Sequence, residues 1–411
     1  MQTNRFELTT AQLKAIAADF QNKITIGLSK DNTEILCIPT YITPKKDIDN
    51  AKILVLDWGG TNFRAAIVQF ENGQPRIIEN RQMPLSKTET KGFSKSDLSK
   101  VIADAIAQLQ FLDNSVTAIG YCFSYPAEAM QDGDAKLLRW TKEIDVPELL
   151  QQLVGKSLLD YLNQHAEIKQ KTTFKTIKVL NDTVACLFAG LAHKGYDTYI
   201  GLIVGTGTNM AGLVQPEKIQ KLNKNLNYTE ALPVNLESGN LIPSPDTLLI
   251  DEKYLTEFDK HVDEHSNNKG QQIFEKAISG GYLGEIFKHV FPNYNHDAKF
   301  DTEKLTVVMN NPENYSQEFS AVARQIYERS AQLVAASIAG LVNLLATHDN
   351  TIKKVCVAAE GGLFWGQNEY SEIVSKEVHN LLAEFGCGDI QVTIAKTNDA
   401  NLIGSAIAAL S

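Results

Sequence analysis

Apolar positions near the N-terminus recur with the spacing of a helix. From Leu13 to Phe20 the apolar residues repeat every three or four positions, which is typical of one buried helix face. Thr9 or Thr10 precedes them, and either hydroxyl group can cap the first turn. The pattern therefore predicts an amphipathic helix over residues 11–20.

Short apolar runs bounded by turn residues follow this helix. An Asn72-Gly73 pair, which favours a tight hairpin turn, separates two of these runs. The runs predict a three-stranded meander with strands over 53–56, 63–70 and 76–78. Beyond the meander, the pattern predicts a helix over 98–109, a strand over 118–123, a strand ending at 179–180 and a helix over 184–192.

The pattern of strand, glycine-rich turn and strand then appears a second time. Apolar runs over 200–204 and 210–214 flank the second turn. The GTN triplet at 60–62 in the first turn corresponds to GTN at 207–209 in the second. The repeat predicts two related α/β halves, with a ligand bound between them where strand ends and turns face one another.

Composition places the chain among soluble globular proteins. Its 411 residues suffice for two or three domains, and 43% are hydrophobic and 21% charged. A net charge of −10 argues against nucleic acid and anionic membranes as partners. The N-terminus lacks the pattern of a signal peptide, and the most apolar helical stretch, 333–346, is shorter than the ~20 residues that span a membrane. We therefore expect a cytoplasmic protein.

The five cysteines are scattered along the chain and include no C-x-x-C pair. That pattern favours free thiols over disulfides or a zinc site. They are Cys37, Cys122, Cys186, Cys356 and Cys387.

The first glycine-rich turn has the features of a phosphate-binding loop. Residues 54–64 read LVLDWGGTNFR, so the strand-end carboxylate of Asp57 is followed by Gly59, Gly60 and the hydroxyl of Thr61. Glycine backbone can approach an anion closely, a hydroxyl can donate to a phosphoryl oxygen, and a carboxylate can hold hydrated Mg²⁺.

The second turn, GTGTN at 205–209, again follows a predicted strand. For either turn alone, a tight hairpin with incidental polar residues is the simpler interpretation. Two such turns in matching places favour a pair of loops around one triphosphate. Neither is a Walker loop, because the pattern GxxxxGK[ST] does not occur in the sequence.

Short polar side chains beside apolar runs suit a site that binds several hydroxyl groups. They occur in FSYP at 123–126, RWTK at 139–142 and LNDT at 180–183. The simplest role for 181–183 is to cap the helix that follows, and Asp182 could cap and still serve chemistry. Glu237 and Glu275 are surface carboxylates by default, since most glutamates are exposed.

Together, the motifs resemble those of the hexokinase family, the ATP-dependent sugar kinases with an actin-like, ribonuclease-H-like ATPase fold. The resemblance runs from about residue 10 to the C-terminus. D-x-G-G-T alone is less specific, whereas FSYP with WTK, LNDT and ISGGYLGE is much more so. The motifs, in order, are LVLDWGGTNFR, FSYP, RWTK, LNDT, IGLIVGTGTN, NLESG, FEKAISGGYLGEIF and VAAEGGLF.

The resemblance implies two ribonuclease-H-like domains around a central cleft, each a mixed sheet flanked by helices. The small domain would comprise 51–183 plus about 397–411, and the large domain 1–50 plus 184–396. Asp182 would be the general base for the sugar hydroxyl. The residues implied around the sugar are Ser124, Thr141, Lys142, Asn181, Asp182, Asn209, Glu237, Gln272 and Glu275.

The resemblance also implies ATP and Mg²⁺ as cofactors. Lys142 and Arg64 would be the cations that stabilise charge on the transferring phosphoryl group. Asp57 would hold Mg²⁺ through water. The residues implied around the nucleotide are Asp57, Gly59, Gly60, Thr61, Asn62, Gly205, Thr206, Gly361 and Gly362.

The chain departs from the family pattern in three places. Ser238 stands where the family has an aromatic residue, which predicts altered discrimination between sugars. Glu360 stands where an aspartate is usual, and the C-terminal turn at 400–406 lacks a lysine, so adenine contacts should differ.

The expected activity is transfer of the γ-phosphoryl group of Mg·ATP to the 6-hydroxyl of a hexose, and glucose is the first candidate for that hexose. We expect the protein to be a monomer or a homodimer. A kinase for mannose, fructose or an amino sugar is the nearest alternative. A non-catalytic sugar sensor is another, although Asp182, Lys142 and both phosphate loops are all present. The sugar-contacting motifs disfavour a protein ATPase of the actin or heat-shock type.

Overall fold

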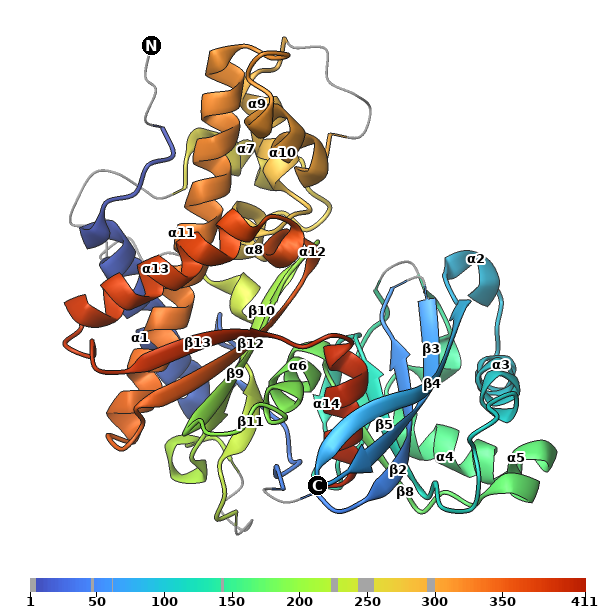
Figure 1. Cartoon of the computed structure of the whole chain (residues 1–411). Helices are drawn as coiled ribbons and strands as arrows, with labels where there is room; N and C mark the ends of the chain where they lie inside the picture. The colour runs from blue at the N-terminus through green and yellow to red at the C-terminus, as the bar shows by residue number, and fades with distance from the viewer. Residues whose placement is uncertain are drawn as a thin grey trace.

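The computed structural model describes residues 5–45, 48–60, 62–141, 144–222, 228–242, 255–293 and 300–411. The chain forms two lobes, each built around its own sheet, and the last helix returns to the smaller lobe (Figure 1).

The smaller lobe holds a five-stranded sheet in the order β4-β3-β2-β5-β8. The first three strands pair antiparallel, which confirms the predicted meander, and β5 and β8 continue the sheet in parallel. Its strands are β2 (Ala51–Trp58), β3 (Asn62–Glu71), β4 (Gln74–Pro84), β5 (Ala118–Phe123) and β8 (Thr176–Leu180), beside a hairpin of β6 (Ala127–Ala129) and β7 (Ala135–Leu137). Its helices are α2 (Lys87–Thr90), α3 (Lys95–Ala107), the 3-10 turn Pro147–Leu149, α4 (Val154–Gln164) and α5 (Ala166–Lys171).

The larger lobe holds a six-stranded sheet in the order β1-β11-β10-β9-β12-β13. Its strands are β1 (Ile38–Pro39), β9 (Thr198–Val204), β10 (Thr208–Val214), β11 (Leu232–Asn235), β12 (Lys354–Glu360) and β13 (Gln391–Lys396). Its helices are α1 (Thr10–Ser29), α7 (Glu257–Glu264), α8 (Ile273–Ile278), α9 (Leu283–Val290), α10 (Thr302–Asn310), α11 (Gln317–His348), α12 (Gly362–Gly366) and α13 (Asn368–Glu384), with 3-10 turns at Pro216–Lys218 and Ser238–Asn240.

The two sheets repeat one topology. Antiparallel β4-β3-β2 is extended by parallel β5 and β8, and antiparallel β11-β10-β9 is extended in the same way by β12 and β13. β2 therefore corresponds to β9, and the two glycine-rich turns lie at equivalent places. This arrangement confirms the two related α/β halves, although the residue boundaries of the domains stay a prediction.

Two helices cross between the lobes. α6 (Asp182–Gly190) follows the last strand of the smaller sheet but packs on β9, β10 and β12 of the larger one. α14 (Ala400–Ala409) follows the last strand of the larger sheet and packs on β2, β5 and β8. The helices meet at Gly404, where a Cβ atom would lie 1.8 Å from the Ala185 carbonyl oxygen, so only glycine permits this approach.

Each lobe has its own apolar core, and a third core joins them. The third core contains Val184 of α6 and Ala406 of α14, with Val55 from the smaller sheet and Ala211 from the larger. The lobes are thus connected by packed apolar surface at the crossing helices. All five cysteines are free, as predicted.

α1 and α11 both extend beyond the ranges that the sequence pattern predicts. Thr9 caps α1 by accepting a hydrogen bond from the Gln12 backbone N–H at 3.2 Å. α11 has 32 residues and, by length and composition, could cross a membrane, so the prediction of a short apolar stretch is wrong. Its most apolar segment is 78% buried in the lobe, which makes α11 a core helix.

A buried ion pair ties α7 to α11. Arg329 Nη1 and Nη2 each donate to an Asp259 carboxylate oxygen at 2.7 Å, and the two side chains are 1% and 4% exposed. Removing Arg329 leaves the buried Asp259 carboxylate without its opposite charge, so we expect Arg329→Met to lower the free energy of unfolding by about 3 kcal/mol.

The matched control for Arg329→Met is Arg324→Met on the same helix. Arg324 pairs with Glu369 at 2.7 Å, but both side chains are exposed, so its loss should cost under ~1 kcal/mol. Thermal and urea unfolding measure both variants. Equal losses would show that burial of the Arg329 pair adds nothing.

Candidate active site

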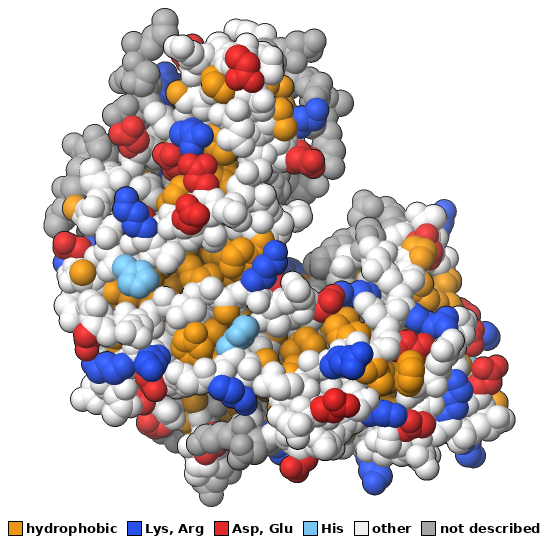
Figure 2. Space-filling view, viewed as in Figure 1, with side chains coloured by type: hydrophobic (Ala, Val, Ile, Leu, Met, Phe, Trp, Pro, Cys, Tyr) orange, Lys and Arg blue, Asp and Glu red, His pale blue; other side chains and the backbone are white. Residues whose placement is uncertain are grey.

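A large cavity lies between the two lobes. Its volume is about 930 Å³, and Figure 2 shows that the surface of the molecule is hollowed between the lobes. Strand ends, the start of α6 and the turns of the larger sheet contribute its polar lining. Among the predicted sugar-contacting residues, those that line it are Ser124, Asn181, Asp182, Asn209, Glu237, Gln272 and Glu275.

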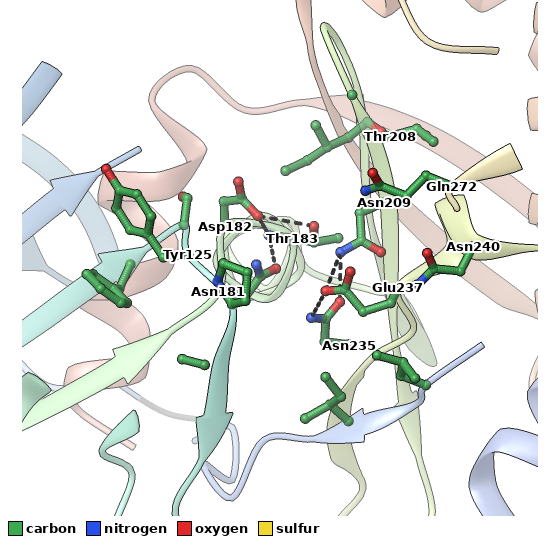
Figure 3. Close-up of a pocket in the computed structure, with 18 of the residues that line it drawn as sticks. Tyr125, Asn181, Asp182, Thr183, Thr208, Asn209, Asn235, Glu237, Asn240 and Gln272 are labelled. Carbon is green, nitrogen blue, oxygen red and sulfur yellow. Dashed lines mark hydrogen bonds between the residues drawn. The ribbon is translucent and has the colours of Figure 1, made fainter. Parts of the chain in front are cut away.

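Asp182 is the first residue of α6 and faces the cavity. Asn181 is the N-cap, and its Oδ1 accepts a hydrogen bond from the Thr183 backbone N–H at 2.8 Å, which confirms the predicted cap. Asp182 Oδ1 accepts from the same N–H group at 2.8 Å. The positive end of the helix dipole therefore stabilises the Asp182 carboxylate. Figure 3 shows Asp182 and Asn181 across the cavity from Asn209 and Glu237.

Two amides orient Glu237 on the opposite wall (Figure 3). Asn235 Nδ2 donates to Glu237 Oε1 at 2.7 Å, and Asn209 Nδ2 donates to Asn235 Oδ1 at 2.8 Å. Asn209 and Asn235 lie on the neighbouring strands β10 and β11, so the sheet positions both. Glu237 itself has φ of 57°, a left-handed conformation that costs free energy and clusters at functional sites.

Glu237 and Glu275 are both partly buried and line the cavity, so the default interpretation as surface carboxylates does not apply to them. Burial raises the pKa of Glu237, and the charge of Asp182 adds to that effect. Burial also raises the pKa of Glu275, opposed by a hydrogen bond from the Thr208 N–H at 2.9 Å. A Cβ atom on Gly207 would lie 2.7 Å from Glu275 Oε2, so a larger residue there would displace this carboxylate.

Gln272 enters the cavity from the start of α8. Its φ of 52° is also left-handed, and its Oε1 accepts a hydrogen bond from Asn268 Nδ2 at 2.7 Å. The larger lobe therefore holds two strained residues, Glu237 and Gln272, at the same cavity. Their surroundings must fix both conformations.

A second cavity, of about 300 Å³, adjoins the first. Ser124 and Asp182 line both cavities, so Asp182 stands at their junction. Predicted phosphate-loop residues supply most of the remaining lining, which is Asp57, Gly59, Asn62, Arg64, Gln82 and Asn401.

Arg64 is held by two carboxylates in this second cavity. Its Nε and Nη2 donate to Asp57 Oδ2 at 2.9 and 2.5 Å, and its Nη1 donates to Asp399 Oδ1 at 2.8 Å. Burial acts to lower the pKa of Arg64, but the charges and hydrogen bonds of the two carboxylates outweigh it and raise the pKa. The guanidinium group is therefore charged and fixed in position.

The second glycine-rich loop meets the turn at Gly361 and Gly362, two residues that the resemblance places around the nucleotide. Thr206 lines the first cavity, and the carbonyl oxygens of Gly205 and Thr206 accept from backbone N–H groups of residues 280–281 at 2.7 and 3.0 Å. A Cβ atom on Gly205 would lie 3.5 Å from Gly361 Cα, so the loop and the turn that continues into Gly362 lie side by side.

Not every predicted site residue lines a cavity. Thr61 and Lys142 lie outside the described residues, and Thr141 lines neither of the two cavities. Ser238 is 2% exposed and packed inside the protein, whereas Asn240 two residues later lines the first cavity. Ser238 therefore does not line the first cavity, and its predicted effect on sugar discrimination stays a prediction.

Several polar residues at or beside the cavities were not among the predicted site residues. Thr40 follows β1, a strand of two residues that gives no periodic signal. Asn240 is the last residue of a 3-10 turn and lines the first cavity. Asn401 in the first turn of α14 lines the second cavity, and Asp399, the N-cap of that helix, binds Arg64; the altered glycine-rich turn was the one available signal for both.

Comparison with protein families matches almost the whole chain. One model described as "Hexokinase" matches residues 2–192, and a second with the same description matches 199–321 and 301–411. Hexokinase-7 of Oryza sativa subsp. japonica is 28% identical over 97% of this chain and 93% of its own. Hexokinase-1 of Arabidopsis thaliana is 28% identical over 98% and 88%.

Solved structures match the fold. The hexokinase from Schistosoma mansoni complexed with glucose has a TM-score of 0.75 at 23% identity, covering 99% of this chain and 97% of its own. Another hexokinase crystal structure has a TM-score of 0.79 at 22% identity, with the same coverage. These likenesses confirm the predicted fold of two actin-like ATPase domains with mixed sheets and flanking helices.

Proposed function

Because this chain belongs to the hexokinase family of ATP-dependent sugar kinases, we propose that it transfers the γ-phosphoryl group of ATP to the 6-hydroxyl of a hexose, with glucose as the first candidate. We further propose that it acts in the cytoplasm. The position of Asp182 at the junction of the two cavities carries the proposal.

Asp182 would act as the general base. Of the two described residues that line both cavities, Ser124 and Asp182, only the carboxylate can take up a proton from a hydroxyl group at neutral pH. A hexose in the larger cavity would place its 6-hydroxyl beside Asp182, and the γ-phosphoryl group would approach from the smaller one. The proton then moves to the Asp182 carboxylate as the 6-oxygen bonds to the γ-phosphorus, while the bond from that phosphorus to the bridging oxygen breaks and ADP leaves.

The larger lobe would select and hold the sugar. Asn209, Glu237, Gln272 and Glu275 offer amide and carboxylate groups to several hydroxyls at once, as polyol recognition requires. Burial removes part of the hydration of the Glu237 and Glu275 carboxyl groups, and this loss raises the pKa of both. Hydrogen bonds from sugar hydroxyls would replace the missing water.

The smaller cavity suits the phosphates and Mg²⁺. Its oxygen donors include Asp57 and Asn62, and oxygen is the ligand that Mg²⁺ prefers. Asp57 would hold such an ion together with phosphate oxygens and water. Bound Mg²⁺ would neutralise phosphate charge. Arg64 adds a fixed positive charge beside it.

The direct test measures ADP release from ATP with a panel of hexoses. The panel holds glucose, mannose, fructose and glucosamine, each with and without Mg²⁺. Hexose-dependent ADP release, with the product identified as the 6-phosphate, supports the proposal. Hexose binding without ADP release would identify a sugar sensor, and release that no hexose stimulates would identify another ATPase.

Hexose should also draw the two lobes together. The proposed contacts come from both, with Asp182 on one side and Asn209 and Glu237 on the other, so a bridging ligand favours the closed state. We expect small-angle X-ray scattering to give a smaller radius of gyration with saturating glucose than without it. An unchanged radius would show that hexose binds within one lobe or that the free protein is already closed.

A further inference from the structure

We propose that Lys276 is a positioning residue for hexose binding, because its ammonium group fixes the segment that presents Gln272 to the cavity. The inference rests on the proposed function, since it assigns a role in holding the hexose. Lys276 lies on α8 directly after Glu275, but it is 2% exposed and lines neither cavity. Its effect on the sugar must therefore pass through other residues.

Oxygen atoms of the preceding segment enclose the Lys276 ammonium group. Nζ lies 2.6 Å from Asp263 Oδ1 and donates to the Asn268 carbonyl oxygen at 3.0 Å. The Asp263 carboxylate also accepts from the Gly270 backbone N–H, at 2.9 and 3.1 Å. One ion pair between the buried Lys276 and the partly buried Asp263 thus ties the end of α7 and the turn at 268–270 to α8.

The turn fixed in this way orients Gln272. Asn268, whose carbonyl oxygen accepts from Lys276, uses its own Nδ2 to donate to Gln272 Oε1 at 2.7 Å. In this arrangement Asn268 occupies Gln272 Oε1, so Nε2 is the end that the side chain would offer to a hexose hydroxyl. The left-handed backbone of Gln272 needs such external support.

A buried ion pair is weak evidence for stability, because desolvation of the two charges offsets much of their attraction. The pair does fix geometry, since both Asp263 oxygens and the Lys276 ammonium are committed to named partners. Loss of the ammonium group should therefore loosen Gln272 and its neighbour Glu275. Hexose binding should weaken, while the transfer step at Asp182 is spared.

The test compares Lys276→Met and Asn268→Ala with Lys288→Met. Lys288 pairs with Glu285 at 2.8 Å on the next helix and lines neither cavity, so it is the matched control. We expect the KM for hexose to rise about tenfold in Lys276→Met and about fivefold in Asn268→Ala. The kcat and the KM for ATP should stay within about threefold of wild type, because uniform substrate binding is what is lost.

A purely structural role for Lys276 gives a different result. Lys276→Met would then lower the Tm and the yield of active enzyme, yet the active fraction would keep the wild-type KM for hexose, which overturns the proposal. Asn268→Ala removes the hydrogen bond to Gln272 Oε1 but keeps the ion pair between Lys276 and Asp263. It therefore tests the connection to Gln272 without loss of the ion pair. An unchanged hexose KM in that variant also overturns the proposal.

Calorimetric titration with glucose separates this inference from the proposed function. If the wild type binds glucose without releasing ADP, the kinase proposal fails, and the Kd values of the variants still decide the role of Lys276. If the wild type turns over hexose but the variants bind it as tightly, only the inference fails. A wild type that binds no hexose overturns both.

Discussion

Asp182→Asn is expected to lower kcat by about 10²–10⁴-fold while the protein still folds and binds hexose nearly as the wild type does. Asparagine matches aspartate in shape and remains able to accept hydrogen bonds at the start of α6, as Asp182 does from the Thr183 N–H. What it cannot do is accept a proton from the sugar hydroxyl. Steady-state kinetics should therefore show the loss in kcat and not in the KM for hexose.

The competing role for Asp182 is that of a helix-terminal carboxylate only. Asp301→Asn tests that role, because Asp301 caps α10 by accepting from the Lys304 N–H at 3.2 Å and lines neither cavity. We expect wild-type kcat from Asp301→Asn. If Asp182→Asn also stays within threefold of wild type, the helix terminus explains Asp182 and the general base lies elsewhere.

Local sequence signals predicted the parts of this fold that rest on local physics. The meander around Asn72-Gly73 and the strand at 118–123 follow from turn chemistry and apolar runs, and the structure has both. The GTN repeat indicated two related halves, and the shared topology of the sheets confirms them. A two-residue strand such as β1 has no period to detect, so Thr40 at the cavity could not be predicted.

Local patterns do not indicate burial where tertiary packing overrides a local default, and only the family resemblance, not the local pattern, predicted Glu237 and Glu275 around the sugar. Glu237 and Glu275 look like surface glutamates in sequence, but hydrogen bonds from Asn235 and the Thr208 N–H hold them at a cavity. α11 is twice the length suggested by its apolar stretch, because its first half packs polar residues such as Arg329 into the lobe. The sequence does not indicate which distant residue forms the hydrogen bond or ion pair with each of these side chains.

The two carboxylates that bind Arg64 lead to a second prediction, a large loss of kcat on substitution of Asp57. Asp57→Asn is expected to lower kcat by about 10²–10³-fold, the usual cost of removing one preorganised group that stabilises transition-state charge. Asp57 is 7% exposed at the edge of the smaller cavity and binds the Arg64 guanidinium through Oδ2. Its loss would remove both a carboxylate for hydrated Mg²⁺ and one of the two partners of Arg64.

Asp399→Asn separates those two contributions. Asp399 is the other carboxylate partner of Arg64, and its left-handed backbone, with φ of 52°, is one that asparagine tolerates. This variant should lower kcat by about tenfold or less, since Arg64 keeps Asp57. Kinetics across a Mg²⁺ titration should show a raised Mg²⁺ requirement in Asp57→Asn and a wild-type requirement in Asp399→Asn. Equal losses with unchanged Mg²⁺ dependence would mean that Asp57 acts through Arg64 alone, because either carboxylate would then serve only to hold the guanidinium group.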